Sequence, residues 1–471
     1  MSSPRNSPCG PSPRRTDRGS AVITVLVLAA VTAVIASSFL FRSVQEAKLA
    51  GRTLFQSVAL NLAEGGLEEG LHAANSSGYT VANGWALATG STTDYIKTIT
   101  TGFTFQQATG AVYIRLDGAA SLAPVVIATG VVTVPGQPRI VKQLRIAGVK
   151  RHLWSNGVVS RGTLTFSGSA AIDSYDSTVG PWNSATNRTD RITVASASTA
   201  LDPVVVGSSA SIYGYVATTG ADPVVGSGGR IFGATTPSGT NVDTSRIRKD
   251  FTSNFPEVTT PTTGSPVAIS AVSSSLTLPR GGDTPGTNGR YIYTTSSVSL
   301  AGSNNLRIRG PVDLIVTGNV SFSGNSALTV GDGGTSATSS FNLYTPGTIS
   351  LGGNGMINYT DDPAKTTFWG TAASPATQTV TLTGNNSFTG TIYAPNATIT
   401  LTGSGDTSGS VIGQSVTVGG NGKFHYDTRL ADVQTTLDTS FRISAWSELT
   451  GVAGSGTAFA RDNRVPFNTL F

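Results

Sequence analysis

The longest uncharged apolar run of the sequence, residues 20–41, constrains the fold more than any other feature. The run begins at Ser20, ends at Phe41 and contains neither a charged residue nor a proline. In an α-helix its 22 residues would rise by about 33 Å, which is enough to cross the hydrocarbon core of a bilayer. The sequence therefore predicts a transmembrane helix at residues 20–41.

Charged residues on either side of this run predict its orientation. Arg14, Arg15 and Arg18 precede it, and Arg42 follows it. Positive charge is retained on the cytoplasmic side of a membrane helix. We therefore expect a single-pass protein of the inner (cytoplasmic) membrane, with a cytoplasmic N-terminus and an extracytoplasmic C-terminal region.

The overall charge of the chain does not indicate a nucleic-acid partner. The formal net charge is +5, and residues 1–19 contribute +3 of it, so the remaining chain carries about +2. No basic patch with interleaved aromatic residues is present in the sequence, and binding to nucleic acid is not expected. The single cysteine, Cys9, also lies within residues 1–19, so no disulfide framework is expected in the rest of the chain.

Glutamate is distributed in a way that separates a helical region from a β-rich one. Only six glutamates occur, and four of them lie between Glu46 and Glu69. Glutamate favours helices and is depleted in strands. Apolar residues recur nearby at positions 47, 54, 58, 62, 67 and 71, close to helical spacing. We therefore expect the membrane helix to continue as an amphipathic helix to about residue 75, with little helix thereafter.

The first 75 residues contain several short motifs in a characteristic order. A basic leader ends at Gly19, a small residue and the apolar run follow, and Glu46-Ala-Lys-Leu-Ala-Gly51 precedes Ala63-Glu-Gly-Gly-Leu67. In this order the motifs, over about residues 14–75, resemble the N-terminal region of PilX-type minor pilins and of the related K-type minor pseudopilin.

This resemblance implies a processing site and a set of partners. Prepilin peptidase would cleave between Gly19 and Ser20, and Ser20 would then be N-methylated. The other expected partners are further pilins or pseudopilins and the inner membrane. Major pilins carry glutamate at the fifth mature position, which is Thr24 here. This departure favours a minor subunit in an unusual place, such as a filament tip, and the alternative is a plain anchor that is never processed.

Residues 76–150 are expected to form a small β-rich domain. Four segments bounded by glycine or proline have the composition of strands: 111–116, 124–128, 130–134 and 140–146. They predict a small antiparallel sheet between the helix and the main body of the chain.

From about residue 151 a short motif recurs: a branched or Thr residue, a polar residue, an apolar residue, any residue, Gly, then Ser or Asn. From residue 298 onward successive copies are 22, 29, 31, 19 and 17 residues apart. Each copy predicts a short strand ended by a glycine that needs positive φ, and stacked copies would bury the apolar faces that a single copy cannot. The copies begin at Leu164, Val298, Val320, Ile349, Val380, Ile399 and Val416.

The fold class expected from these patterns is mainly β: a long N-terminal transmembrane and amphipathic helix, the small β-rich domain, and a right-handed parallel β-helix. The β-helix would span residues 151–430, with a Thr-, Ser- and Pro-rich linker or insertion at about 235–265 and a C-terminal tail at 431–471. An antiparallel sandwich with similar glycine turns is the alternative for the large region.

The segment at about residues 300–450 shows a second resemblance to a protein family. Phe388-Thr-Gly-Thr-Ile-Tyr-Ala-Pro-Asn396 and Phe424-His-Tyr-Asp427 are similar to an uncharacterised β-helical domain at the C-terminus of many pilus-assembly-like bacterial proteins. This resemblance implies an architecture and no known activity.

Candidate catalytic and metal-binding residues are few. Two pairs of acidic residues, Asp173 with Asp176 and Asp361 with Asp362, are the only close pairs of the large region. Hydrolysis of a glycan needs two carboxyl groups that face one sugar, whereas Asp is common in turns between strands.

The three histidines, His72, His152 and His425, are far apart in the sequence and show no metal-ligand spacing. Gly331-Asp-Gly-Gly334 is a single fragment and not a calcium repeat. We therefore expect no catalytic residues, no metal and no cofactor.

These observations favour a minor-pilin-like subunit or assembly protein that is anchored by its helix and displays a β-helix for filament initiation or adhesion. Surface glycans are a further candidate partner for the Ser-, Thr- and Asn-rich faces. The alternatives are a membrane-tethered carbohydrate-active enzyme, whose activity would depend on the acidic pairs, and a static surface adhesin.

Overall fold

The computed structural model describes residues 18–464, apart from short gaps at 77, 101, 106, 122, 151, 262–265, 375–376, 385–386, 404, 436, 438–440, 453 and 456–459. Within this part the chain divides into two compact units. Unit 1 contains the chain up to Val149 together with the residues from Phe441 onward, and unit 2 contains Lys150–Ser440. Residues 1–17 of the predicted leader, which runs to Gly19, lie outside the described residues.

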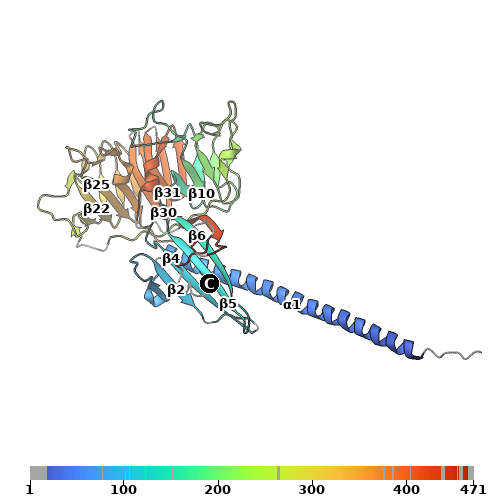
Figure 1. The fold of residues 1–471 in the computed structure, drawn as a ribbon. Helices are drawn as coiled ribbons and strands as arrows, with labels where there is room; N and C mark the ends of the chain where they lie inside the picture. Colours follow the sequence, from blue (N-terminus) through green and yellow to red (C-terminus); the bar gives the residue numbers. More distant parts are fainter. Residues whose placement is uncertain are drawn as a thin grey trace, which may run out of the picture. The chain divides into compact units, whose positions relative to one another are not determined.

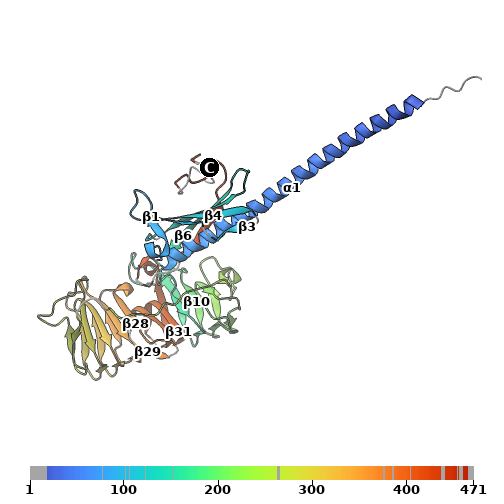
Figure 2. The same ribbon diagram turned by 90° about the horizontal axis from the view of Figure 1, so that it is seen from below.

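Helix α1 (Arg18–Ser76) is continuous over 59 residues. Its first half extends beyond the sheet of unit 1, and its second half lies along one face of that sheet (Figures 1 and 2). The second half buries Phe55, Ala59, Ala63 and Leu67. Of the apolar positions predicted to line one face, Leu67 is buried and Val58, Leu62 and Leu71 pack half-buried on the sheet, whereas Leu54 is 44% exposed. Alanine and glycine lie between these larger side chains at the contact with the sheet.

The sheet of unit 1 has the strand order β1-β2-β4-β5-β6-β33, with β3 paired to β4. The pairings from β1 through β6 are antiparallel. Strand β33, in the segment expected to be a tail, lies next to β6, so the chain returns to unit 1 after unit 2. The elements of unit 1 after α1 are η1 (Val81–Asn83), β1 (Trp85–Leu87), β2 (Tyr95–Ile99), β3 (Thr104–Phe105), β4 (Ala108–Asp117), β5 (Val125–Thr133), β6 (Ile140–Lys150) and β33 (Phe441–Glu448).

Strand β5 corrects one expectation from the sequence. The segments 124–128 and 130–134 were predicted to be two strands separated by a turn at Gly130, but they form the single strand β5. Gly130 lies where α1 crosses the sheet, and a Cβ there would lie 2.0 Å from the carbonyl oxygen of Ala59. The glycine permits close packing of helix and strand, and it does not make a turn.

Both faces of this sheet are covered. Val112, Ile114 and Val126 pack with the second half of α1, whereas Ile127 on the other face packs with Leu449. The end of β33 is also held by an ion pair, since the Lys142 ammonium lies 2.5 Å from the Glu448 carboxylate.

Unit 2 is built from parallel strands, most of which pair with the third strand before and after them in the chain. Strand β10, for example, pairs with β7 and with β13. Three ladders result, called A, B and C below. Parallel pairing of this kind agrees with the expectation of a mainly β region and not with an antiparallel sandwich.

Ladder A contains eleven strand segments. Its inward row runs from Val267 through Phe368, Ile392 and Val158 to Ile247. The strands are β17 (Val267–Ala268), β19 (Tyr291–Thr295), β22 (Pro311–Val316), β25 (Ser340–Thr345), β28 (Thr366–Gly370), the first parts of β30 (Phe388–Gly403) and β31 (Asp406–Gly420), β7 (Val158–Ser160), β10 (Thr193–Ser196), β13 (Tyr215–Ala217) and β16 (Ile247–Arg248).

Ladder B contains the recurring sequence motif. The seven copies begin seven strand segments that pair in register, and their first apolar residues form one buried row. Six motif glycines have positive φ, as predicted: Gly168, Gly302, Gly324, Gly353, Gly403 and Gly420. The strands are β20 (Val298–Leu300), β23 (Val320–Phe322), β26 (Ile349–Leu351), β29 (Gln378–Gly384), the second parts of β30 and β31, β8 (Leu164–Phe166), β11 (Val204–Val206) and β14 (Val224–Val225).

Ladder C is divided between two sheets. Four strands, β18 (Leu276–Leu278), β21 (Asn305–Ile308), β24 (Ala327–Val330) and β27 (Met356–Asn358), form a sheet of their own. The rest are the start of β31, β32 (Lys423–Asp427), β9 (Ala171–Tyr175), β12 (Ser211–Tyr213) and β15 (Arg230–Phe232). Short 3-10 helices lie at η2 (Thr244–Arg246), η3 (Pro363–Lys365) and η4 (Thr428–Asp432).

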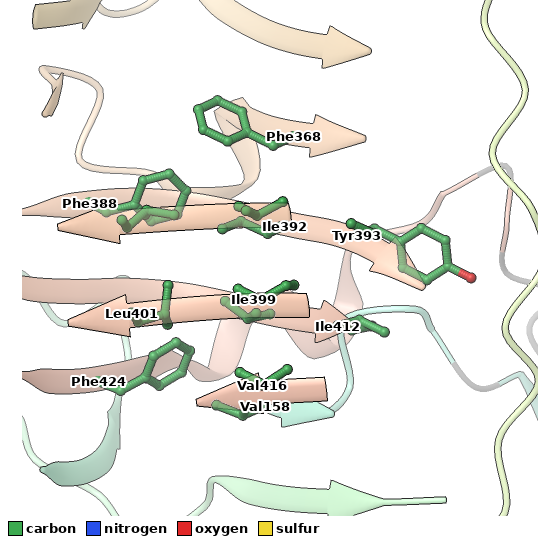
Figure 3. Close-up of a cluster of buried hydrophobic side chains, with 14 of the residues drawn as sticks. Val158, Phe368, Phe388, Ile392, Tyr393, Ile399, Leu401, Ile412, Val416 and Phe424 are labelled. Carbon is green, nitrogen blue, oxygen red and sulfur yellow. The ribbon is translucent and has the colours of Figure 1, made fainter. Parts of the chain in front are cut away.

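The order of the strands in space differs from their order in the chain. Strands β31 and β32, near the end of unit 2, pair with β7, β8 and β9, which are its first strands. The early strands therefore continue the ladders where the late ones stop. Inward side chains form continuous rows across this junction: Ile392, Val411 and Val158 are register partners on ladder A, and Ile392 and Val158 are labelled in Figure 3.

A crossing segment, residues 251–261, leads from the end of the early strands back toward the far end of the ladders. It lies against the outward side of ladder A, where the Tyr393 hydroxyl donates to the Pro256 carbonyl at 2.7 Å and Phe255 packs under the Arg161 guanidinium. The sequence predicts a linker or insertion at 235–265, but this range also contains β16, which pairs with β13.

Candidate functional site

The first half of α1 has the features expected of an anchoring or assembly element. Between residues 21 and 54 almost every side chain is exposed, and most of the large ones are apolar. By length and composition α1 could span a membrane. Exposed apolar side chains of this kind include Ile23, Leu26, Leu28, Ile35, Phe39 and Phe41.

Hydroxyl groups within the apolar half bond to the helix itself. The Thr32 hydroxyl donates to the Leu28 carbonyl at 2.9 Å, and the Ser37 hydroxyl donates to the Ala33 carbonyl at 2.7 Å. Such bonds satisfy the polar groups without water. The first ion pair along the described helix is Arg42 with Glu46 at 3.2 Å, so the polar surface begins where the apolar run ends.

The predicted processing residues lie at the start of this helix. Gly19 and Ser20 follow Arg18, the first residue of α1, and Thr24 is exposed one turn further along. Cleavage after Gly19, methylation of Ser20 and the role of Thr24 stay predictions.

The structure brings two candidate residues of unit 2 together where the last and the first strands pair. Asp173 on β9 and His425 on β32 are register partners, and the His425 Nδ1 lies 2.5 Å from the Asp173 Oδ1. Both side chains are buried, with 5% and 2% exposure. The pair therefore joins residues that are 252 positions apart in the chain.

Two further side chains from the loop after β9 complete this cluster. The Trp182 indole donates to Asp173 Oδ1 at 3.0 Å, and the Arg188 Nε donates to Asp173 Oδ2 at 2.8 Å. Trp182 also stacks on the His425 ring at 4.0 Å between centroids. The Asp173 carboxylate is thus held by three donors in a buried network, which is costly to break once one partner is removed.

Trp182 and Arg188 were not predicted from the sequence as site residues. They lie in a loop without periodicity, and their partners are on strands that only the fold brings near. A tryptophan and an arginine in one polar loop are the only local signal.

The other acidic candidates lie in turns near their own strands and helices. The Asp176 carboxylate accepts from the Thr178 hydroxyl at 2.6 Å, and this bond, with the backbone N–H of Thr178, lowers the Asp176 pKa. Asp362 accepts from the backbone N–H of Ala364 at the start of η3, and Asp361 has a φ of 53°. Asp in such positions is typical of turns and caps.

The remaining candidates do not gather at one place. His72 is exposed on α1 in unit 1, whereas His152 belongs to unit 2. Asp332 between Gly331 and Gly333 pairs with Arg309 at 2.8 Å. Within the described residues no group of three or more His, Cys, Asp or Glu side chains is placed to hold a metal.

Comparison with protein families gives one match. Residues 258–433 match the model of a domain of unknown function, DUF7305. The matched range contains β17 to β32 and omits the early strands β7 to β16. No curated protein matches the chain.

Among solved structures the chain is similar to the competence-associated pilin ComZ from Thermus thermophilus. The identity is 11%, the TM-score is 0.21, and the alignment covers 76% of this chain and 88% of that one. At this TM-score the similarity carries no information about function.

Proposed function

We propose that this chain is a pilin-like minor subunit whose N-terminal helix anchors it and joins it to other pilins, while unit 2 is displayed outside the membrane. The observation that supports the proposal most is the division of α1. Its first half is apolar and exposed, and its second half packs on an antiparallel sheet. An exposed apolar helix of this length needs a bilayer or other apolar helices around it.

The motifs before and along α1 support the finer assignment. In this proposal prepilin peptidase cleaves after Gly19, Ser20 becomes the N-terminus, and Thr24 stands where bulk subunits carry a glutamate. The subunit is then a minor one of PilX or K type, in the inner membrane before assembly and in a filament or pseudopilus afterwards.

Unit 2 is proposed to be a right-handed parallel β-helix with three ladders as its three sides. Pairing of each strand with the third strand along the chain supports this, as do the inward rows of Val, Ile, Leu and Phe. Its proposed role is display for filament initiation or adhesion.

Photo-cross-linking in cells that assemble the filament tests the assembly role. A photoreactive residue at Leu28, which is 64% exposed on the first half of α1, should cross-link to other pilins. The same residue at Val81, which is 86% exposed in unit 1, is the matched control and should not give that product. Cross-links to lipid alone in cells with filaments would contradict the assembly role.

A further inference from the structure

The outward side of ladder C carries a row of side chains that the proposed anchoring role does not use. Lys423, Ala171, Ser211 and Arg230 are register partners on the adjacent strands β32, β9, β12 and β15. Their neighbours Phe424, Ile172, Ile212 and Ile231 are buried, so this row faces outward. Lys423 and Arg230 stand three strand spacings apart, about 14 Å, with small residues between them.

Aromatic rings beside this row hold three cations in place. The Arg230 guanidinium lies 4.0 Å from the Phe232 ring centroid, and the Arg188 guanidinium lies 4.1 Å from that of Tyr213. Lys423 lies 5.7 Å from the Trp182 ring centroid. A cation over an aromatic face loses part of its freedom while its outer edge stays in solvent.

The rings form a connected support. Tyr213 and Phe232 meet edge to face at 5.1 Å, and Trp182 is fixed by its stacking on His425 and its bond to Asp173. We call Lys423, Arg188 and Arg230 with these three rings the ladder C surface.

Positive charge exceeds negative charge on this surface. Arg230 is exposed and has no ion pair with an acidic residue of the described chain. The Arg188 Nε donates to the buried Asp173 carboxylate, which leaves the two terminal nitrogens of the guanidinium for a ligand. Lys423 faces Asp406 at 3.8 Å, a long contact between half-exposed side chains.

We propose that the ladder C surface binds an acidic polysaccharide, with Arg230 and Lys423 at its two ends as contacts for sugar carboxylates. Guanidinium groups suit planar carboxylates, and the shallow row over Ala171 and Ser211 leaves room for a chain to lie between the cations. Trp182, Tyr213 and Phe232 are half-buried and support the three cations, which are the proposed contacts for the sugar. The proposal rests on the proposed display role and names its ligand class.

Binding of the detergent-solubilised full chain to immobilised alginate, a polyuronate, tests this proposal. We expect Arg230→Gln and Lys423→Gln each to weaken alginate binding about threefold to tenfold, and added salt to weaken it further. Arg248→Gln is the matched control, because it removes the same charge from an exposed position at the end of ladder A. Arg188 is left unchanged, since its loss would strand the buried Asp173 carboxylate.

Each outcome of this assay decides the proposal. Alginate binding that is weakened at both ends of the row but kept by Arg248→Gln, with neutral dextran not bound, supports it. Equal binding of alginate by wild type and by Arg230→Gln overturns the proposal. Binding of dextran as tight as that of alginate overturns it too. Binding of a DNA oligonucleotide as tightly as alginate overturns the assignment to sugars. Cross-linking from Leu28 tests the assembly role without using alginate. The alginate assay and the cross-linking experiment can therefore fail independently of each other.

Discussion

At the scale of single residues, small side chains decide how closely α1 approaches the sheet of unit 1. A Cβ at Gly66 would lie 2.6 Å from Val112 Cγ1 and 2.9 Å from the Ala128 Cβ. A Cβ at the preceding residue, Gly65, would meet nothing within 4 Å. The two neighbouring glycines therefore have different roles, although the sequence does not distinguish them.

We predict opposite effects of alanine at these two positions. Gly66→Ala should lower the free energy of unfolding of unit 1 by about 1–3 kcal/mol through overpacking. Gly65→Ala should raise it by up to about 1 kcal/mol, because alanine favours an exposed helix. Thermal unfolding of the detergent-solubilised variants measures both effects, and equal destabilisation by both would contradict the close packing of α1.

Asp94 makes the stability of unit 1 depend on pH. Its carboxylate accepts from the backbone N–H of Gly118 at 2.9 Å and pairs with Arg115 at 3.1 Å. The bond from Gly118, with smaller contributions from Ser91 and Arg115, lowers the Asp94 pKa below 3.8.

The depressed pKa fixes the direction of the effect. Stability from Asp94 is present above the unfolded pKa near 4 and is lost as pH falls through the lower folded pKa. Asp94→Asn should therefore destabilise unit 1 at neutral pH and flatten the loss of stability as the pH falls below about 4. If the acid-unfolding curves of wild type and Asp94→Asn run parallel, the contacts of Asp94 do not contribute to the pH dependence of stability.

At the scale of elements, the crossing segment 251–261 connects the two ends of the ladders and covers apolar residues on the outward side of ladder A. Trp154, Trp369 and Tyr393 form an aromatic group there, with centroids 5.9 to 6.3 Å apart. Phe255 packs at the edge of the same core. The segment has no regular secondary structure, so these side chains and the Tyr393 hydroxyl hold it in place.

Truncation of one anchor should loosen this segment alone. Phe255→Ala should speed amide hydrogen exchange of residues 252–261 while exchange in ladder B stays unchanged. Ser253→Ala, at an exposed position of the same segment, is the control. Unchanged exchange in Phe255→Ala would show that the side chain does not hold the segment.

Elements with a local signal could be predicted from the sequence, and elements that depend on distant contacts could not. The repeated motif predicts the strands of ladder B and their glycine turns, because each copy contains its own alternation and its own stop. Strand β5 was divided wrongly at Gly130, since the reason for that glycine lies on α1. Strand β33 and the pairing of Asp173 with His425 depend on residues hundreds of positions away.

At the scale of the whole molecule, unit 2 has its first strands joined to its last. The early strands β7 to β16 continue ladders that β31 and β32 would otherwise end. The matched domain of unknown function covers the later strands only. We infer that the early strands, with the buried Asp173 and His425 pair, complete an edge that the later strands leave open.

An engineered disulfide tests this order of strands. Thr165 and Thr417 are half-buried register partners on ladder B, and adjacent strands place Cα atoms within the range that disulfides bridge. In a Cys9→Ser chain, Thr165→Cys with Thr417→Cys should form a disulfide on mild oxidation. Thr165→Cys with Ser299→Cys, several strands apart, should not. Peptide mass mapping distinguishes the two, and a disulfide in the second pair only would contradict the strand order.

The division of α1 and the motifs before it carry the proposed role of the whole molecule. The most direct test is the N-terminal mass of the protein recovered from cells that contain a prepilin peptidase. We predict that the chain begins at Ser20 with one N-methyl group, and that a Gly19→Leu variant keeps its leader. A wild-type protein that retains residues 1–19 intact would contradict the pilin-like assignment and favour a plain membrane anchor.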